Sequence, residues 1–135
     1  MRNKQGRILI AAGLLLGMAA GAYGQDGVRA QVPFSFAVRG RTLPAGTYSI
    51  ERSFTNDPNT LELRSEQGAQ MKVYAMVEFT GPEAGSKLVF DRYGEHYFLR
   101  EVWTAQGRHV LGESREESRL ARGARPAVVA VATGR

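Results

Sequence analysis

The chain contains no cysteine. Disulfide bonds, thiolate metal ligands and a cysteine nucleophile are therefore excluded. Small exported domains of eukaryotes usually depend on disulfides. If this chain is exported, the lack of cysteine indicates a bacterial protein of the envelope or the cell exterior whose fold depends on its apolar core alone.

The sequence motifs of the common enzyme classes are absent as well. There is no Gly-x-Ser-x-Gly elbow, no phosphate-binding P-loop and no pair of histidines at helical spacing. The two histidines of the chain are His96 and His109, which are too far apart in sequence to suggest a metal motif. We therefore predict a protein that is not an enzyme and has no cofactor and no bound metal.

Two sets of polar residues come closest to a chemical site. The first set consists of Asp91, Glu95, His96 and His109. Pairing of strands could bring these possible metal ligands together, but no ligand spacing supports that, and a solvated hairpin rim explains them. The second set, Glu95 and Glu101, could form the carboxylate pair of a glycosidase. Ion pairs with neighbouring arginines explain these two glutamates more simply.

The first residues have the three parts of a secretory signal peptide. A basic segment with three cations precedes an uncharged apolar segment at residues 8–22, and small residues at positions 22 and 24 precede Gln25. The apolar segment is shorter than the ~20 residues of a membrane-spanning helix. We therefore predict cleavage before Gln25, no transmembrane span in the mature chain, and export by the general secretion route to the periplasm or the cell exterior.

The formal net charge of +5 does not describe the predicted folded domain. Three of the five positive charges belong to the leader, and residues 112–135 hold the whole remaining excess, because residues 25–111 contain equal numbers of basic and acidic side chains. This distribution lacks the basic patch that is typical of nucleic-acid-binding proteins. We expect an unknown envelope or extracellular partner and not a nucleic acid.

Apolar and polar residues alternate with a period of two over much of residues 28–111. This period is typical of strands with one buried face, and its division into seven or so short runs predicts an all-β antiparallel barrel or sandwich. Pro33 cannot donate to a ladder, so its strand is expected at an edge or with a bulge. The longest run, Met71, Val73, Ala75, Val77 and Phe79, predicts a central strand.

Residues 87–104 are predicted to form a hairpin that turns at Gly94, which tolerates the positive φ of a tight turn. The second arm breaks the alternation, because residues 97–99 are consecutive large apolar residues. Either both faces of this arm are covered, or a bulge near residues 100–101 shifts the register.

The aromatic residues of this hairpin have two interpretations. Exposed on a sheet, Tyr93, Tyr97 and Trp103 would form a platform for a sugar or a peptide. Buried, they would be part of the core, which is the commoner place for aromatic residues in a small β domain. We predict that Phe90 and Trp103 belong to the core.

After the strands the composition changes. Ser114 and Glu117 have the spacing of a capping box, which predicts a short charged helix within residues 112–123. Only Leu120 and Ala121 offer apolar side chains for docking, so we expect its charges to form a solvated face. Residues 124–135, rich in alanine, valine and glycine, are expected to be a disordered tail. The predicted organisation is thus a leader at 1–24, a β domain at 25–111, the helix and the tail.

The order of several segments resembles a family of small, uncharacterised exported β proteins that are abundant in soil acidobacteria. The segments are VPFSF at residues 32–36, LPAGTY at 43–48, LVFDRYG at 88–94, YFL at 97–99 with VW at 102–103, and the helical residues 114–120. The resemblance implies an exported β protein, and it implies no activity and no site residues. The function we expect is that of a non-catalytic interaction or structural module. The alternatives are a small barrel that carries an apolar ligand and an enzyme of unrecognised type.

Overall fold

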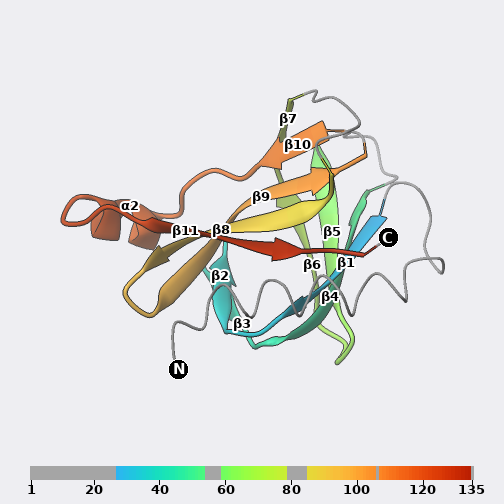
Figure 1. Cartoon of the computed structure of the whole chain (residues 1–135), viewed down its shortest axis with the longest axis horizontal. Helices are drawn as coiled ribbons and strands as arrows, with labels where there is room; N and C mark the ends of the chain where they lie inside the picture. The colour runs from blue at the N-terminus through green and yellow to red at the C-terminus, as the bar shows by residue number, and fades with distance from the viewer. Residues whose placement is uncertain (1–26, 54–58, 79–84, 106, 135) are drawn as a thin grey trace.

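Strands dominate the part of the chain that the computed structural model describes, which is residues 27–53, 59–78, 85–105 and 107–134. Eleven strands form two sheets, and one short helix, α2 (Arg115–Ala121), follows the strand β10 (Gly107–Val110) (Figure 1). The all-β prediction is confirmed. Of the two architectures that we expected, the closed barrel is not formed by the described residues, because both sheets stay open. Two packed open sheets agree in part with the alternative, a sandwich, although the described strands are more numerous than the seven or so that we expected. The predicted leader lies outside the described residues.

The smaller sheet is antiparallel and has four strands in the order β1-β4-β5-β6. The bounds are β1 (Gly27–Val32), β4 (Gly46–Arg52), β5 (Thr60–Ser65) and β6 (Gln70–Tyr74). Alternate residues along these strands are buried, as the period of two predicts, so this sheet turns one apolar face toward the larger sheet.

The larger sheet has seven strands, five of them in the order β11-β8-β9-β10-β7. These are β11 (Ala127–Ala132), β8 (Lys87–Tyr93), β9 (His96–Thr104), β10 (Gly107–Val110) and β7 (Met76–Glu78). The hairpin of β2 (Phe36–Val38) and β3 (Arg41–Leu43) joins β9 through one parallel pair, Ala37 with Phe98. The β8–β9 hairpin therefore holds β11 on one side and β10 and β2 on the other.

In the order of the described strands, the chain changes sheet three times, and the alternation alone does not reveal the changes after β1 and after β6. Pro33 follows β1, which ends at Val32 on the edge of the smaller sheet, and it lies outside any strand. The strand that we expected to contain this proline is therefore interrupted here. Ala75 separates β6 from β7, and its N–H donates to the carbonyl of Asn59 at 2.8 Å. The long run that we expected to be one central strand is therefore two edge strands in different sheets, and Phe79 lies outside the described residues.

The predicted bulge is present in the second arm of the hairpin. Val89 pairs with Glu101 and Phe90 pairs with Leu99, so Arg100 is an extra residue in β9. The extra residue brings Leu99 and Val102, which are three positions apart, to the same buried face. A regular strand would have placed one of these two side chains on the outer face.

The predicted core positions of Phe90 and Trp103 have different outcomes. Phe90 is 0% exposed and packs edge to face against Phe36, with ring centroids 5.3 Å apart. Trp103 is only half-buried and is not part of the apolar core. Trp103 differs because it follows Val102 directly in the strand, and neighbouring residues of a strand face opposite sides.

The structure differs from the expected disordered tail at residues 127–132. These residues form β11, which pairs antiparallel with β8 along its whole length, and Val129 and Val131 are buried (Figure 1). Gly134 continues the contact, since its backbone exchanges two hydrogen bonds with Arg29 of β1. The edge of β8 supplies the hydrogen-bond partners and the apolar surface that a segment of this composition lacks by itself.

Replacing Phe90 by alanine should lower the free energy of unfolding by about 3–5 kcal/mol, because a fully buried aromatic ring leaves a cavity. Replacing Trp103 by alanine should cost only about 1–2 kcal/mol, the worth of its polar and cation contacts. Denaturant unfolding followed by circular dichroism measures both. Equal losses in the two variants would contradict the assignment of Trp103 to the outer face.

Candidate functional site: a charge cluster beneath α2 and the adjoining cleft

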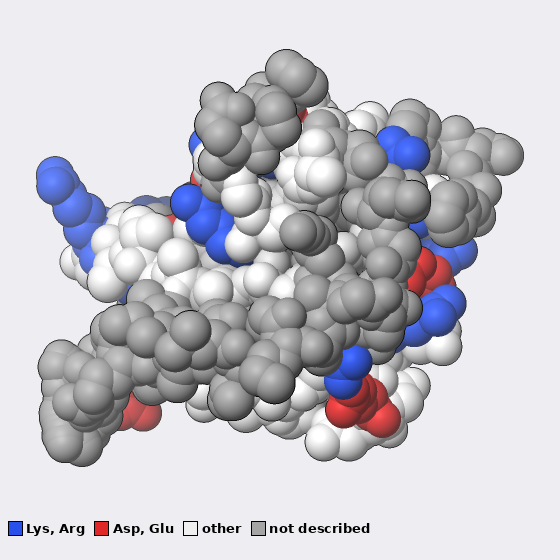
Figure 2. All heavy atoms as spheres, turned by 45° about the vertical axis from the view of Figure 1, so that its right-hand side comes forward, with Lys and Arg blue, Asp and Glu red and all other residues white. Residues whose placement is uncertain are grey.

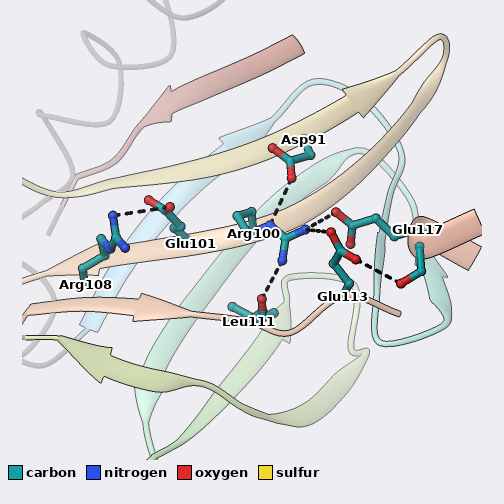
Figure 3. A network of polar contacts seen from close by, with 8 residues as sticks. Asp91, Arg100, Glu101, Arg108, Leu111, Glu113 and Glu117 are labelled. Carbon is teal, nitrogen blue, oxygen red and sulfur yellow. Dashed lines mark hydrogen bonds and ion pairs between the residues drawn. The ribbon is translucent and has the colours of Figure 1, made fainter. Parts of the chain in front are cut away.

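A cluster of charged side chains lies at the bulge, on the outer face of the larger sheet (Figure 3). Its centre is the guanidinium group of Arg100, whose Nε donates to Oδ2 of Asp91 at 3.0 Å and whose Nη1 donates to the carbonyl oxygen of Leu111 at 2.9 Å. Nη2 faces the carboxylates of Glu113, at 3.5 Å, and of Glu117, in hydrogen-bond contact. Strands β8 and β9, the segment after β10 and helix α2 therefore meet at one side chain.

Glu117 holds α2 in this place. Its backbone N–H donates to Oγ of Ser114 at 3.2 Å, so the predicted N-cap is confirmed. The side chain of Glu117 is 3% exposed, and Glu117 is the one buried residue of α2. Leu120, which we expected to dock the helix, is half-buried. The expectation of a purely solvated charged face is therefore wrong for Glu117, because Arg100 supplies a partner beneath the helix.

The cluster has more negative than positive groups. Burial raises the pKa of Glu117 from its ordinary value of 4.5 to about 7. Attraction to Arg100 lowers this pKa, but the nearby carboxylates of Asp91 and Glu113, and a hydrogen bond with Asp91, raise it again. Burial lowers the pKa of Arg100, but the hydrogen bond to Asp91 and the attraction of the three carboxylates together outweigh burial, so that this pKa is raised.

The negative charges of this cluster also affect the hydroxyl group of Tyr93 on β8. Burial raises the pKa of the Tyr93 hydroxyl first, and the charges of Asp91, Glu117 and Glu113 raise it further against the opposing effect of Arg100. A proton on Glu117 would remove one of the excess negative charges without breaking the contact with Arg100, because a protonated carboxyl still accepts a hydrogen bond.

A cleft of about 260 Å³ opens beside this cluster. Its walls are the β2–β3 hairpin, the tip of the β8–β9 hairpin and the first turn of α2 with its cap. The residues that line it are Ser35, Phe36, Ala37, Gly40, Thr42, Glu95, His96, Tyr97, Phe98, Ser114 and Glu116. Hydroxyl groups, two carboxylates, an imidazole and aromatic rings thus surround an open space of mixed polarity.

The three residues of the possible aromatic platform lie in different places. Tyr93 is buried and packs edge to face with Phe98, with ring centroids 6.0 Å apart. Tyr97 stacks on Phe34 at 3.8 Å and reaches the wall of the cleft. The structure brings neither residue to Trp103, because Tyr97 faces the core side of β9 and Trp103 the outer side.

Trp103 has its own polar surroundings. Nζ of Lys87 lies 4.5 Å from the centre of its ring and the guanidinium carbon of Arg108 lies 5.9 Å away. Its indole Nε1 donates to Oε1 of Glu101 at 2.8 Å. Cationic side chains thus already lie against the surface that a stacked ligand would use.

The possible metal ligands do not converge either. Asp91 is paired with Arg100, whereas Glu95 and His96 lie at the exposed hairpin tip. His109 is 2% exposed, its Nε2 lies 3.2 Å from Oγ1 of Thr104, and burial, followed by repulsion from an arginine, lowers its pKa. No group of three or more metal-ligating residues is found in the part of the chain that the structure describes.

The two glutamates of the possible catalytic pair, Glu95 and Glu101, also have different surroundings. Glu101 lies 3.7 Å from a guanidinium nitrogen of Arg108, which is the ion pair that the simpler interpretation predicts (Figure 3). Glu95 lies on the cleft wall. The residues that sequence reasoning missed are Arg100, Glu113 and Glu117. The only signal in the sequence was the capping-box position of Glu117 together with the expected bulge beside Arg100.

The charged side chains of the surface are mixed in sign. On the face shown in Figure 2, lysine and arginine lie in small separate groups, some of them next to aspartate or glutamate. The ion pair of Arg64 with Glu62, at 3.3 Å, belongs to this kind of surface. Within the described residues, no helix has the length and apolar character needed to cross a membrane.

Comparisons of the chain with family models, with curated proteins and with solved structures give no match.

Replacing Glu117 by glutamine should remove a dependence of stability on pH. A carboxyl whose pKa rises from 4.5 to about 7 on folding contributes stability that is complete below pH 4.5 and is lost as the pH rises through 7. The wild-type free energy of unfolding should therefore fall by about 2–3 kcal/mol relative to the Glu117→Gln variant between pH 5 and pH 8. Urea unfolding at several pH values measures the difference.

Glu116→Gln is the matched control, because Glu116 is an exposed residue of the same helical turn. This variant should keep the wild-type dependence on pH. If the free energy of unfolding of the wild type changes with pH in parallel with that of Glu117→Gln over the whole range, the pKa of Glu117 does not differ between the folded and the unfolded state.

Proposed function

We propose that this chain is exported by the general secretion route and acts in the periplasm or outside the cell as a non-catalytic interaction module. Its binding site is the cleft between the β2–β3 hairpin, the tip of the β8–β9 hairpin and α2. The compartment is supported by the basic, apolar and small-residue segments that precede Gln25, and by the resemblance to exported acidobacterial β proteins. The binding role is supported chiefly by the cleft.

The lining of the cleft favours a polar ligand. The hydroxyl groups of Ser35 and Thr42 and the carboxylates of Glu95 and Glu116 face a space of about 260 Å³, which is close to the lower limit of ~300 Å³ for small-molecule sites. Carboxylates and hydroxyls accept hydrogen bonds from hydroxyl and ammonium groups. The ligand class that fits best is a sugar unit with free amino groups, as part of an envelope or extracellular polymer.

A carrier of apolar ligands is less well supported. A carrier needs an apolar chamber of several hundred Å³. The cleft is open and partly polar, and the hollow between Leu43, Tyr48 and Leu63 has no volume that a water molecule could occupy. Core side chains such as Tyr48 and Phe90 fill the space between the sheets.

The compartment is tested on protein recovered from the periplasm and the culture medium of its native host. Sequencing of the N-terminus should begin at Gln25, because the small residues before it fit the signal peptidase site. A mature chain that still begins with Met1 would contradict export with cleavage.

Binding is tested by calorimetry with the mature chain and two probes, oligomers of glucosamine and oligomers of N-acetylglucosamine. Glucosamine oligomers should bind more tightly, because their ammonium groups can pair with Glu95 and Glu116. Glu95→Gln should weaken that binding about tenfold, since a hydrogen bond to a charged group is worth roughly 1.5–3 kcal/mol.

Glu62→Gln is the control, because Glu62 lies on β5 in the smaller sheet and not in the cleft. Binding that is lost equally in Glu62→Gln and Glu95→Gln would place the ligand elsewhere. Absence of binding to both kinds of oligomer would reject this ligand class.

A further inference from the structure

Helix α2 is attached to the sheet by an unusual contact. Helices of soluble proteins normally dock through an apolar stripe, whereas the one buried residue of α2 is Glu117. The chain on both sides of the helix is exposed, at Gly112 and Glu113 before it and at residues 122–125 after it. Buried residues hold the chain only further out, at Leu111 and in β11. Helix α2 is therefore connected to the rest of the fold by an exposed segment at each end, and Glu117 is the one residue of the helix that is buried. Figure 1 shows where the helix lies beside the sheet.

The same helix forms part of the cleft. Its N-cap Ser114 and its residue Glu116 line the cleft, and Glu117 follows them in the same turn. A rotation or displacement of α2 that withdraws Glu117 from Arg100 must also move Ser114 and Glu116. The position of the helix and the shape of the cleft are thus mechanically linked.

The charges that face Glu117 come from each element packed against it. Asp91 belongs to β8, Arg100 belongs to β9, and Glu113 belongs to the segment that leads into the helix (Figure 3). The hydroxyl of Tyr93, also on β8, interacts with the same charges. If all three carboxyls of this group are ionised, one guanidinium faces three negative charges in a site where Asp91 and Arg100 are 15% and 17% exposed. Like charges that share a buried site disfavour full ionisation.

We propose that α2 is a proton-controlled wall of the cleft: with a proton on Glu117 the helix stays against β8 and β9, and loss of that proton releases the helix and opens the cleft. The movement of α2 would regulate the binding site proposed above. The proposal rests on that proposed function only where it treats the cleft as a binding site.

The direction of the response follows from the chemistry of the carboxyl group. The pKa of Glu117 is about 7 in the docked helix and returns toward 4.5 when the side chain reaches water. The docked state therefore binds the proton more tightly, and acid conditions favour docking. The transition between the docked and the released helix therefore occurs near neutral pH. An exported protein is exposed to changes of external pH in this range, because it lacks the buffering of the cytoplasm.

The movement is measured directly with two spin labels, because the chain has no cysteine of its own. Cysteines replace the exposed residues Arg41 on β3 and Arg119 on α2, and electron–electron distances are recorded from pH 5 to pH 8.5. At pH 5 we expect one narrow distance. The ratio of released to docked helices should rise up to tenfold per pH unit between 4.5 and 7, because release is coupled to loss of one proton, and should level off above 7.

Two variants on the same labelled background complete the experiment. Glu117→Gln cannot lose a proton and should keep the narrow distance at every pH, whereas Glu116→Gln, with the charge removed one position away, should respond as the wild type does. Distances that do not change with pH in the wild type, or that shorten as the pH rises, overturn the proposal. An unchanged response in Glu117→Gln also overturns it.

No ligand takes part in these distance measurements, so their outcome is independent of the sugar-binding experiment. A helix that moves with pH in a protein that binds neither oligomer supports the proton-controlled wall and rejects the ligand class. Binding of glucosamine oligomers together with a helix that does not move rejects the wall alone.

Discussion

The extra residue in β9 is the constraint on which the larger sheet depends. Arg100 interrupts the pairing of β8 with β9, and the interruption puts Leu99 and Val102 on the same buried face. It also leaves a long cationic side chain on the outer face, between Asp91 and the carbonyl of Leu111. Because this hairpin supports β11, β10 and β2 as well, one inserted residue determines the packing on both faces of the sheet.

Much of the fold could be predicted from the sequence because the period of two reports burial directly. The β8–β9 hairpin, its turn at Gly94 and the bulge were predicted from short-range patterns, and the structure confirms them. The division of residues 71–78 between two sheets could not be predicted in this way. Residues on both sides of Ala75 keep the same alternation when the strand changes partners, and only long-range pairing decides which sheet each half joins.

The candidate site was much harder to predict than the fold. The cap at Ser114 was predicted correctly, yet the helix was expected to be solvated because its side chains are mostly charged. The partner of Glu117 lies seventeen positions away in sequence on a different element, and nothing in the local pattern connects the two. Strand β11 was missed for a similar reason, since Ala127–Ala132 becomes ordered through pairing with β8 and has few large side chains to signal it.

The length of α2 connects its contact with the sheet to its own stability. A helix of seven residues is well below the ~12–15 residues at which isolated helices become marginally stable in water. Its cap at Ser114 satisfies one free N–H group, and the rest of its stability must come from the contact with the sheet. A released α2 therefore also unfolds. Docking of Glu117, folding of the helix and completion of the cleft wall are then one equilibrium. If a ligand contacts Ser114 or Glu116 in the folded helix, protonation of Glu117 raises the affinity for that ligand by some factor. Binding of the ligand must then raise the affinity of Glu117 for its proton by the same factor.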